Sequence, residues 1–135
     1  MTDIIKKNLR SYNMSQIKSK NTKPEIIVRK FCHALGLRYK LHEKKLPGKP
    51  DLFFPKHKAV IFVNGCFWHR HNCMLGRAFP KTNISFWNEK FKNTILRDKK
   101  NYQELLANNI KIIKIWECEI RNKAFKSKIL KFFNK

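Results

Sequence analysis

The longest apolar run of the chain covers residues 59–63 and reads Ala-Val-Ile-Phe-Val. It is far shorter than the roughly 20 apolar residues that a membrane-spanning helix needs, so it predicts no membrane segment. Its β-branched and aromatic content, between turn residues 55–58 and Gly65, instead indicates a buried β-strand over residues 59–64. Such a strand has to lie in a sheet that other elements cover.

The segments around this strand carry clear start and stop signals. Thr22 and Glu25 have the spacing of a capping box, and Pro24 is tolerated in a first helical turn, so a helix is expected to begin there and to end at Gly36. The patterning further predicts strands at 37–41 and 51–54, a hairpin turn at 55–58, an irregular stretch at 65–80, a long amphipathic helix at 84–106 ended by residues 108–109, a strand at 110–116 and a final helix at 120–133.

This order of elements predicts an α/β fold with a mixed central sheet flanked by helices. Residues 22–135 are interpreted as a single domain, with neither an internal repeat nor a linker. Residues 1–21 are polar and basic, and we interpret them as a flexible arm that becomes helical when bound. Cys32 falls inside the first helix pattern and is expected in the core.

Charge indicates the class of partner. The chain has 31 Lys and Arg against 9 Asp and Glu, a formal net charge of +22. Such a balance favours a polyanion, either nucleic acid or an anionic membrane surface. No single basic amphipathic helix collects the charge, which favours nucleic acid, although an AT-rich genome would also raise the lysine content. With 42% hydrophobic residues, the chain is not a disordered basic tail.

The cysteines point to a metal. No secretory signal is visible at the N-terminus, so we expect a cytosolic protein whose cysteines are metal ligands or plain thiols. Cys66, Cys73 and Cys118, with either His69 or His71, supply the four ligands of a closed structural zinc site. The alternative is unpaired buried thiols and surface histidines.

A second group has the chemistry of metal-assisted phosphodiester hydrolysis. Asp51 begins one predicted strand, Asn64 and Gly65 lie at the end of the next, and His69 lies beyond them. A carboxylate suits Mg²⁺, and an imidazole can take a proton from the attacking water. Asp51 is alternatively an acid that caps a turn, and Glu25 a capping residue. Asp98 either pairs with neighbouring cations on its helix or orients His69.

Aromatic residues interleave with the basic ones. Phe67 and Trp68 lie on the loop between Cys66 and His69, where they can wedge between base steps or form a hydrophobic cluster over the metal. Phe86 and Trp87 are adjacent in the long helix, so one is expected in the core and the other exposed.

Several of these motifs resemble the very-short-patch-repair (Vsr) DNA mismatch endonucleases. The resemblance rests on Leu-Pro-Gly-Lys-Pro-Asp at 46–51, on Val-Ile-Phe-Val-Asn-Gly-Cys-Phe-Trp-His at 60–69, and on the His and Cys at 71 and 73. The pairs at 86–87 and 97–98 and Trp-Glu-Cys at 116–118 continue it in the same order, as do residues 13–17. It covers about residues 10–121.

The resemblance implies a restriction-endonuclease-like fold of the PD-(D/E)XK type, with a zinc-stapled loop and a basic N-terminal arm. The implied activity is nicking of one strand 5′ to the thymine of a T·G mismatch, the product of 5-methylcytosine deamination. By this resemblance, Asp51 and the Val63 carbonyl would bind Mg²⁺, with Glu25 near the metal waters, and His69 would be the general base, supported by Asp98. The implied zinc ligands are Cys66, His71, Cys73 and Cys118. The implied DNA contacts are intercalation by Phe67, Trp68 and Trp87 and binding by the arm residues Arg10, Asn13 and Met14.

The resemblance also implies partners and exposes departures. Double-stranded DNA is the implied substrate, and mismatch-repair proteins and a cytosine-5 methyltransferase pathway are the implied associates. We expect a bacterial, cytoplasmic and nucleoid-associated protein without membrane contact, and a monomer as the default for a small nuclease that cuts one strand. Asn64 stands where related sequences often carry His, which is expected to slow the reaction, and Val63 and Thr94 also depart from the pattern. Two alternatives remain open: a non-catalytic zinc-stabilised nucleic-acid-binding module, and a nuclease of the same fold that acts on another lesion.

Overall fold

The computed structural model describes residues 22–66 and 69–135. The predicted arm, including Arg10, Asn13 and Met14, and the loop aromatics Phe67 and Trp68 lie outside the described residues. The elements in chain order are α2 (Lys23–Ala34), β1 (Lys40–Leu41), β2 (Leu52–Phe54), the 3₁₀ turn η1 (Pro55–His57), β3 (Ala59–Asn64), α3 (Met74–Arg77), α4 (Ile84–Ala107), β4 (Lys111–Trp116), α5 (Glu117–Arg121) and α6 (Ala124–Phe132). Within these described residues, no helix has the length and apolarity that crossing a membrane requires.

The described strands form a mixed sheet in the order β1-β2-β3-β4. β1 pairs antiparallel with β2, and β2 antiparallel with β3 through the predicted hairpin. β3 and β4 pair in parallel along their full length, from Ala59 opposite Lys111 to Asn64 opposite Trp116. The mixed α/β architecture predicted from the sequence is therefore confirmed, and β3 is the buried strand expected at 59–64.

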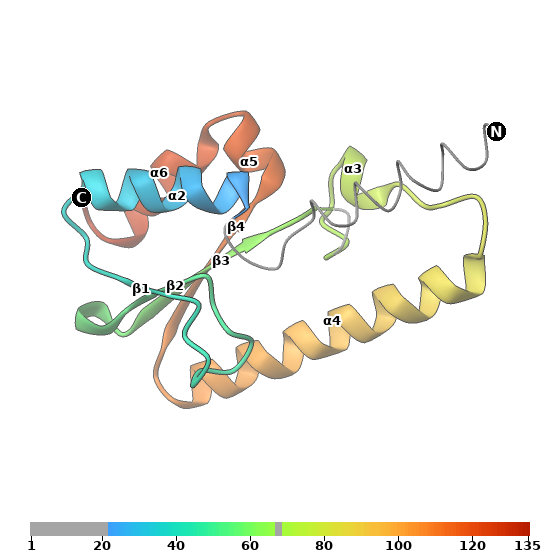
Figure 1. The fold of residues 1–135 in the computed structure, drawn as a ribbon, viewed down its shortest axis with the longest axis horizontal. Helices are drawn as coiled ribbons and strands as arrows, with labels where there is room; N and C mark the ends of the chain where they lie inside the picture. The colour runs from blue at the N-terminus through green and yellow to red at the C-terminus, as the bar shows by residue number, and fades with distance from the viewer. Residues whose placement is uncertain (1–21, 67–68) are drawn as a thin grey trace.

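Helices cover both faces of this sheet (Figure 1). On one face, α2, α5 and α6 pack over inward-facing residues of β2, β3 and β4, in a core that includes Cys32, as predicted. On the other face, Leu105 of α4 packs with Val60 and Phe62 of β3. Alternate residues of β3 thus enter different cores, because successive side chains of a strand point to opposite faces.

The ends of α2 and α4 follow local chemistry as predicted. The Thr22 side chain accepts a hydrogen bond from the Glu25 N–H at 3.4 Å, which caps the start of α2. Gly36 adopts a left-handed backbone (φ 82°) that ends the same helix. Asn109 (φ 61°) has the same conformation just beyond the end of α4.

Three predicted elements were wrong in detail. The strand expected at 37–41 is only Lys40–Leu41, because Leu37 still closes the end of α2 through its N–H bond to the Cys32 carbonyl. The stretch at 65–80, predicted irregular, contains α3. The final helix expected at 120–133 is two helices, α5 and α6, because Lys123 takes a left-handed backbone (φ 65°) that interrupts the helical geometry.

Candidate active site and metal centre

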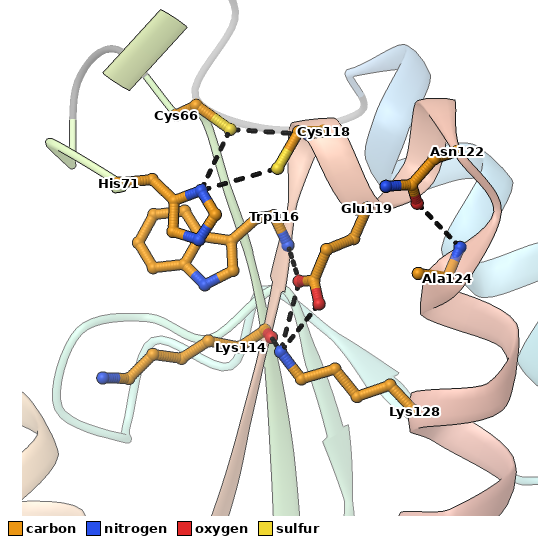
Figure 2. Close-up of polar contacts among 9 residues, drawn as sticks. All are labelled: Cys66, His71, Lys114, Trp116, Cys118, Glu119, Asn122, Ala124 and Lys128. Atoms are coloured by element: carbon orange, nitrogen blue, oxygen red, sulfur yellow. Dashed lines mark hydrogen bonds and ion pairs between the residues drawn. The ribbon is translucent and has the colours of Figure 1, made fainter. Parts of the chain in front are cut away.

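Four predicted zinc ligands converge beyond the ends of β3 and β4. The Cys66, His71, Cys73 and Cys118 ligand atoms all lie within 4.8 Å of one another. His71 Nδ1 lies 3.7 Å from Cys66 Sγ and 3.5 Å from Cys118 Sγ (Figure 2). Bond lengths of about 2.3 Å to sulfur and 2.1 Å to nitrogen place tetrahedral ligand atoms about 3.6 Å apart. The ligand set therefore fits a zinc ion in both chemistry and spacing.

Between the two candidate histidines, the geometry selects His71 for this cluster. Its N–H donates to the Cys66 carbonyl at 3.0 Å, and its ring stacks on Trp116 with centroids 4.1 Å apart and an interplanar angle of 16°. A Cβ on Gly76 would come within 1.8 Å of the His71 carbonyl oxygen, so this close approach of α3 to the loop requires glycine.

The thiols differ in their electrostatic surroundings. Burial raises the pKa of Cys66 above its ordinary value. The Gly76 N–H, which donates to Cys73 Sγ at 3.3 Å, lowers the pKa of Cys73. A thiol that coordinates a metal is deprotonated outright, so a bound cation would compensate the burial of Cys66.

A polar clamp fixes the position of Cys118. Glu119 accepts a hydrogen bond from the Trp116 N–H at 2.8 Å, and Lys128 of α6 donates to Glu119 at 3.2 Å and to the Lys114 carbonyl at 2.5 Å (Figure 2). The clamp holds the junction of β4 and α5 against α6, and Cys118 lies in the first turn of α5. The cysteine–histidine cluster is thereby joined to the main core.

A second cluster lies where α2 meets β2 and β3. Glu25, His42 and Asp51 each offer a ligand atom within 4.8 Å of the others. Asp51 Oδ2 accepts a hydrogen bond from the Val63 N–H at 2.7 Å. The Glu25 side chain is only 1% exposed and contacts the guanidinium of Arg29 and the imidazole of His42. The sequence allowed Glu25 to be only a helix-capping residue. In the structure its carboxylate lies in the same cluster as Asp51.

The environment of Asp51 favours its neutral form when no cation is bound. Burial raises the pKa of Asp51 well above its ordinary value of 3.8, and hydrogen bonding and charge from Glu25 raise it further. Two carboxylates this close repel each other when both are ionised. A divalent cation among their oxygen ligands would remove that penalty, so the residues present fit Mg²⁺ or a similar ion.

His69 and Asp98 form a hydrogen-bonded pair, one of the two possibilities that the sequence left open for Asp98. His69 Nδ1 lies 2.5 Å from Asp98 Oδ2, and both side chains remain about one quarter exposed. When Nδ1 carries the proton donated to Asp98, Nε2 is the basic nitrogen of the ring. The pair therefore has the form of a general base with an orienting carboxylate.

Tyr102 lies between the acidic cluster and this pair. The buried Asn64 donates a hydrogen bond from Nδ2 to the Tyr102 hydroxyl at 3.2 Å. The pKa of Tyr102 is raised to about 12, mainly by burial and further by the charges of Asp98 and Asp51. The hydrogen bond from Asn64 offsets part of this rise. Tyr102 is thus electrostatically coupled to both acids. Beside it opens a cavity of about 430 Å³, whose lining includes His69, Asp98, Lys99, Tyr102 and Lys114.

The structure also places the remaining candidates. Trp87 is partly buried and packs on Phe91 with centroids 5.6 Å apart, whereas Phe86 is 58% exposed. Thr94 donates to the Lys90 carbonyl of its own helix.

His42 was not predicted from the sequence as a site residue. The usable signal was a histidine shortly before the Leu-Pro-Gly-Lys-Pro-Asp segment.

The sequence of this chain is similar to those of known proteins. The family described as "DNA mismatch endonuclease Vsr" matches residues 2–75. The Type II nicking enzyme V.NmeAIP of Neisseria meningitidis serogroup A is 48% identical over 92% of this chain and 88% of its own length. The Type II nicking enzyme V.XorIIP of Xanthomonas oryzae is 42% identical over 89% and 88%, and the DNA mismatch endonuclease Vsr of Escherichia coli K12 is 33% identical over 91% and 78%. The chain belongs to the Vsr family of DNA mismatch endonucleases.

Proposed function

We propose that this protein nicks one strand of duplex DNA 5′ to the thymine of a T·G mismatch, by metal-dependent phosphodiester hydrolysis. The observation that carries the proposal is the grouping of two unlike sites around the end of β3. One is the carboxylate cluster of the buried Glu25 and the partly buried Asp51, and the other is the His69–Asp98 pair. The names of the relatives, nicking enzymes and a mismatch endonuclease, support the same reaction.

The acidic cluster is the proposed metal site. Asp51 and the carbonyl of Val63 would hold Mg²⁺, with Glu25 close to its waters. The bound ion would supply Lewis-acid stabilisation of the charge that develops on the phosphate. The Val63 N–H bond to Asp51 orients the carboxylate toward the end of β3 before any ligand arrives. This restraint lowers the cost of arranging the site during the reaction.

His69 is the proposed general base. Its Nε2 would accept a proton from the attacking water, and Asp98 would hold the ring and stabilise the imidazolium that forms. Asn64, which takes the place of a histidine common in relatives, contacts Tyr102, so His69 is the imidazole proposed for the proton transfer. The cavity beside His69 gives space for the strand, and Lys99 and Lys114 on its wall suit a phosphate backbone.

The remaining family features complete the proposal. The domain would have the restriction-endonuclease-like fold, with zinc on Cys66, His71, Cys73 and Cys118 stapling the aromatic loop. Trp87 with the loop residues Phe67 and Trp68 would wedge into the base stack, and the arm with Arg10, Asn13 and Met14 would contact the DNA. The net charge of +22 supports a duplex DNA partner.

The test is a nicking assay on strand-labelled duplexes that carry T·G, U·G, an abasic site or a normal pair, with Mg²⁺ present. We expect a cut in the thymine strand of the T·G duplex alone. Asp51→Asn should abolish it, whereas Glu104→Gln, which removes an exposed carboxylate on α4, should leave it unchanged.

Two outcomes would contradict the proposal. Equal cutting of all duplexes would mean a nuclease for another lesion or structure. Tight, salt-sensitive DNA binding without cutting under any divalent metal and in any flanking sequence would favour a non-catalytic binding module.

A further inference from the structure

His42 contacts both acids of the proposed metal site. Its Nε2 lies 2.9 Å from each carboxylate oxygen of Glu25. Its main-chain N–H donates to the Asp51 carbonyl at 3.1 Å. The His42 side chain is 19% exposed and the Glu25 side chain 1% exposed, so the contact lies mostly away from solvent. One residue therefore joins Glu25 and Asp51, which are far apart in the sequence.

The backbone of His42 is held in an uncommon conformation. Its φ of 48° lies in the left-handed region, which few residues other than glycine adopt, although Asn, Asp and His do so more often than most. The conformation occurs directly after β1, where the His42 N–H reaches Asp51 at the start of β2. Because the main chain is fixed on Asp51, the position of the imidazole over Glu25 is set by the fold.

Charge balance alone does not account for the imidazole. Arg29 already lies 3.3 Å from Glu25 and supplies a permanent positive charge one helical turn away. The ligand atoms of Glu25, His42 and Asp51 lie within 4.8 Å of one another, which is close enough for all three to face one ion. The 2.9 Å separations between His42 Nε2 and the Glu25 oxygens are hydrogen-bonding distances, and they place the ring nitrogen directly against the acids of the site.

We propose that His42 is an imidazole ligand of the metal that Asp51 and the Val63 carbonyl would hold beside Glu25, and that it gives the site a preference for Mn²⁺ over Mg²⁺. This inference rests on the proposed metal-dependent function. Mg²⁺ favours oxygen ligands, whereas imidazole favours the first-row transition metals, and carboxylates accept both. A site with two carboxylates and one imidazole therefore binds Mn²⁺ more tightly than Mg²⁺.

The test measures Mn²⁺ binding by electron paramagnetic resonance on protein whose cysteine site has been loaded with zinc. A directly bound imidazole gives a ¹⁴N coupling in pulsed spectra of the Mn²⁺ ion. We expect this coupling in the unmodified protein and in His33→Gln, a control at an exposed histidine of α2. In His42→Asn, which suits the left-handed backbone, the coupling should vanish and the Mn²⁺ affinity should fall about 10- to 100-fold.

The other histidine near the site is tested separately. His69→Gln should keep the ¹⁴N coupling if His42 is its source. This variant and the unmodified protein decide the assignment even if His42→Asn fails to fold, because zinc occupies His71 and both His33 and His57 are exposed.

The outcomes separate this inference from the proposed function. Mn²⁺ binding without ¹⁴N coupling, or a coupling lost in His69→Gln and kept in His42→Asn, would overturn the role of His42 even if the T·G duplex is nicked. A coupling that depends on His42, in a protein that nicks no duplex, would establish the ligand and reject the proposed reaction.

Discussion

Replacing Asp51 with asparagine is expected to stabilise the protein in buffer free of divalent cations, although it removes a proposed metal ligand. The carboxyl is partly buried beside Glu25, and these surroundings raise the pKa of Asp51 from 3.8 in the native state. Asparagine has nearly the same shape, has no charge, and can still accept the hydrogen bond from the Val63 N–H. The substitution therefore removes the repulsion while keeping the contact.

The sign of the pH dependence follows from proton binding. Because the pKa of Asp51 is higher in the native state than in the unfolded state, the native protein binds more protons between the two values. Stability is therefore lost as the pH rises from about 4 toward the native pKa. A native pKa of about 8 for Asp51 sets an upper bound of about 4 kcal/mol on this loss of stability at pH 7, at 1.36 kcal/mol for each pH unit above 3.8.

The expected gain is smaller than this bound because Asp51 keeps some contact with solvent. We expect Asp51→Asn to gain about 2 kcal/mol at pH 7.5, or roughly 6–10 °C in Tm for a chain of this size. The assay is thermal unfolding of the zinc-loaded protein between pH 4.5 and 8, with Glu104→Gln as a control for loss of an exposed carboxylate. The gain should shrink toward pH 4.5. Saturating Mn²⁺ should stabilise the unmodified protein more than Asp51→Asn.

Either of two results would refute this reasoning. A lower Tm for Asp51→Asn at pH 7.5 would mean that the carboxylate is stabilised by its surroundings. A difference that is constant across the pH range would mean that the substitution acts through packing and not through ionisation.

Three further predictions concern the other groups. Cys118→Ser should release zinc, measured with a chromogenic chelator, and lower the Tm by more than 10 °C, because structural zinc contributes an apparent ~10–16 kcal/mol of binding free energy; an unchanged Tm would exclude a structural role. Asp98→Asn should reduce single-turnover nicking about 10²- to 10⁴-fold with unchanged DNA affinity, because His69 loses its orienting carboxylate; full activity would exclude that role. Lys128→Met should cost about 1–2 kcal/mol in urea unfolding and hasten zinc release, since the Glu119 clamp is lost; equal release rates would show that the clamp does not support the zinc site.

The sequence by itself determined the features that depend on neighbours along the chain. Thr22 caps α2 because its hydroxyl reaches an N–H three residues away, and Gly36 ends that helix because it adopts a left-handed backbone. The apolar run at 59–63 became a buried strand because it is short, β-branched and bounded by turns. The cysteines and histidines of the loop indicated a metal through their chemical type.

Tertiary structure decided which distant groups meet. Only the packing of α2 against the sheet brought Glu25, read locally as a helix cap, next to Asp51 and His42. Only the hydrogen bond between His69 and Asp98 of α4 showed that Asp98 contacts His69 instead of the cations beside it in the sequence. The helix pattern alone allows an acid at this position to do either. The hydrophobic periodicity of a sequence indicates which residues are buried along one element. A site made from three elements forms only when the folded chain brings those elements together.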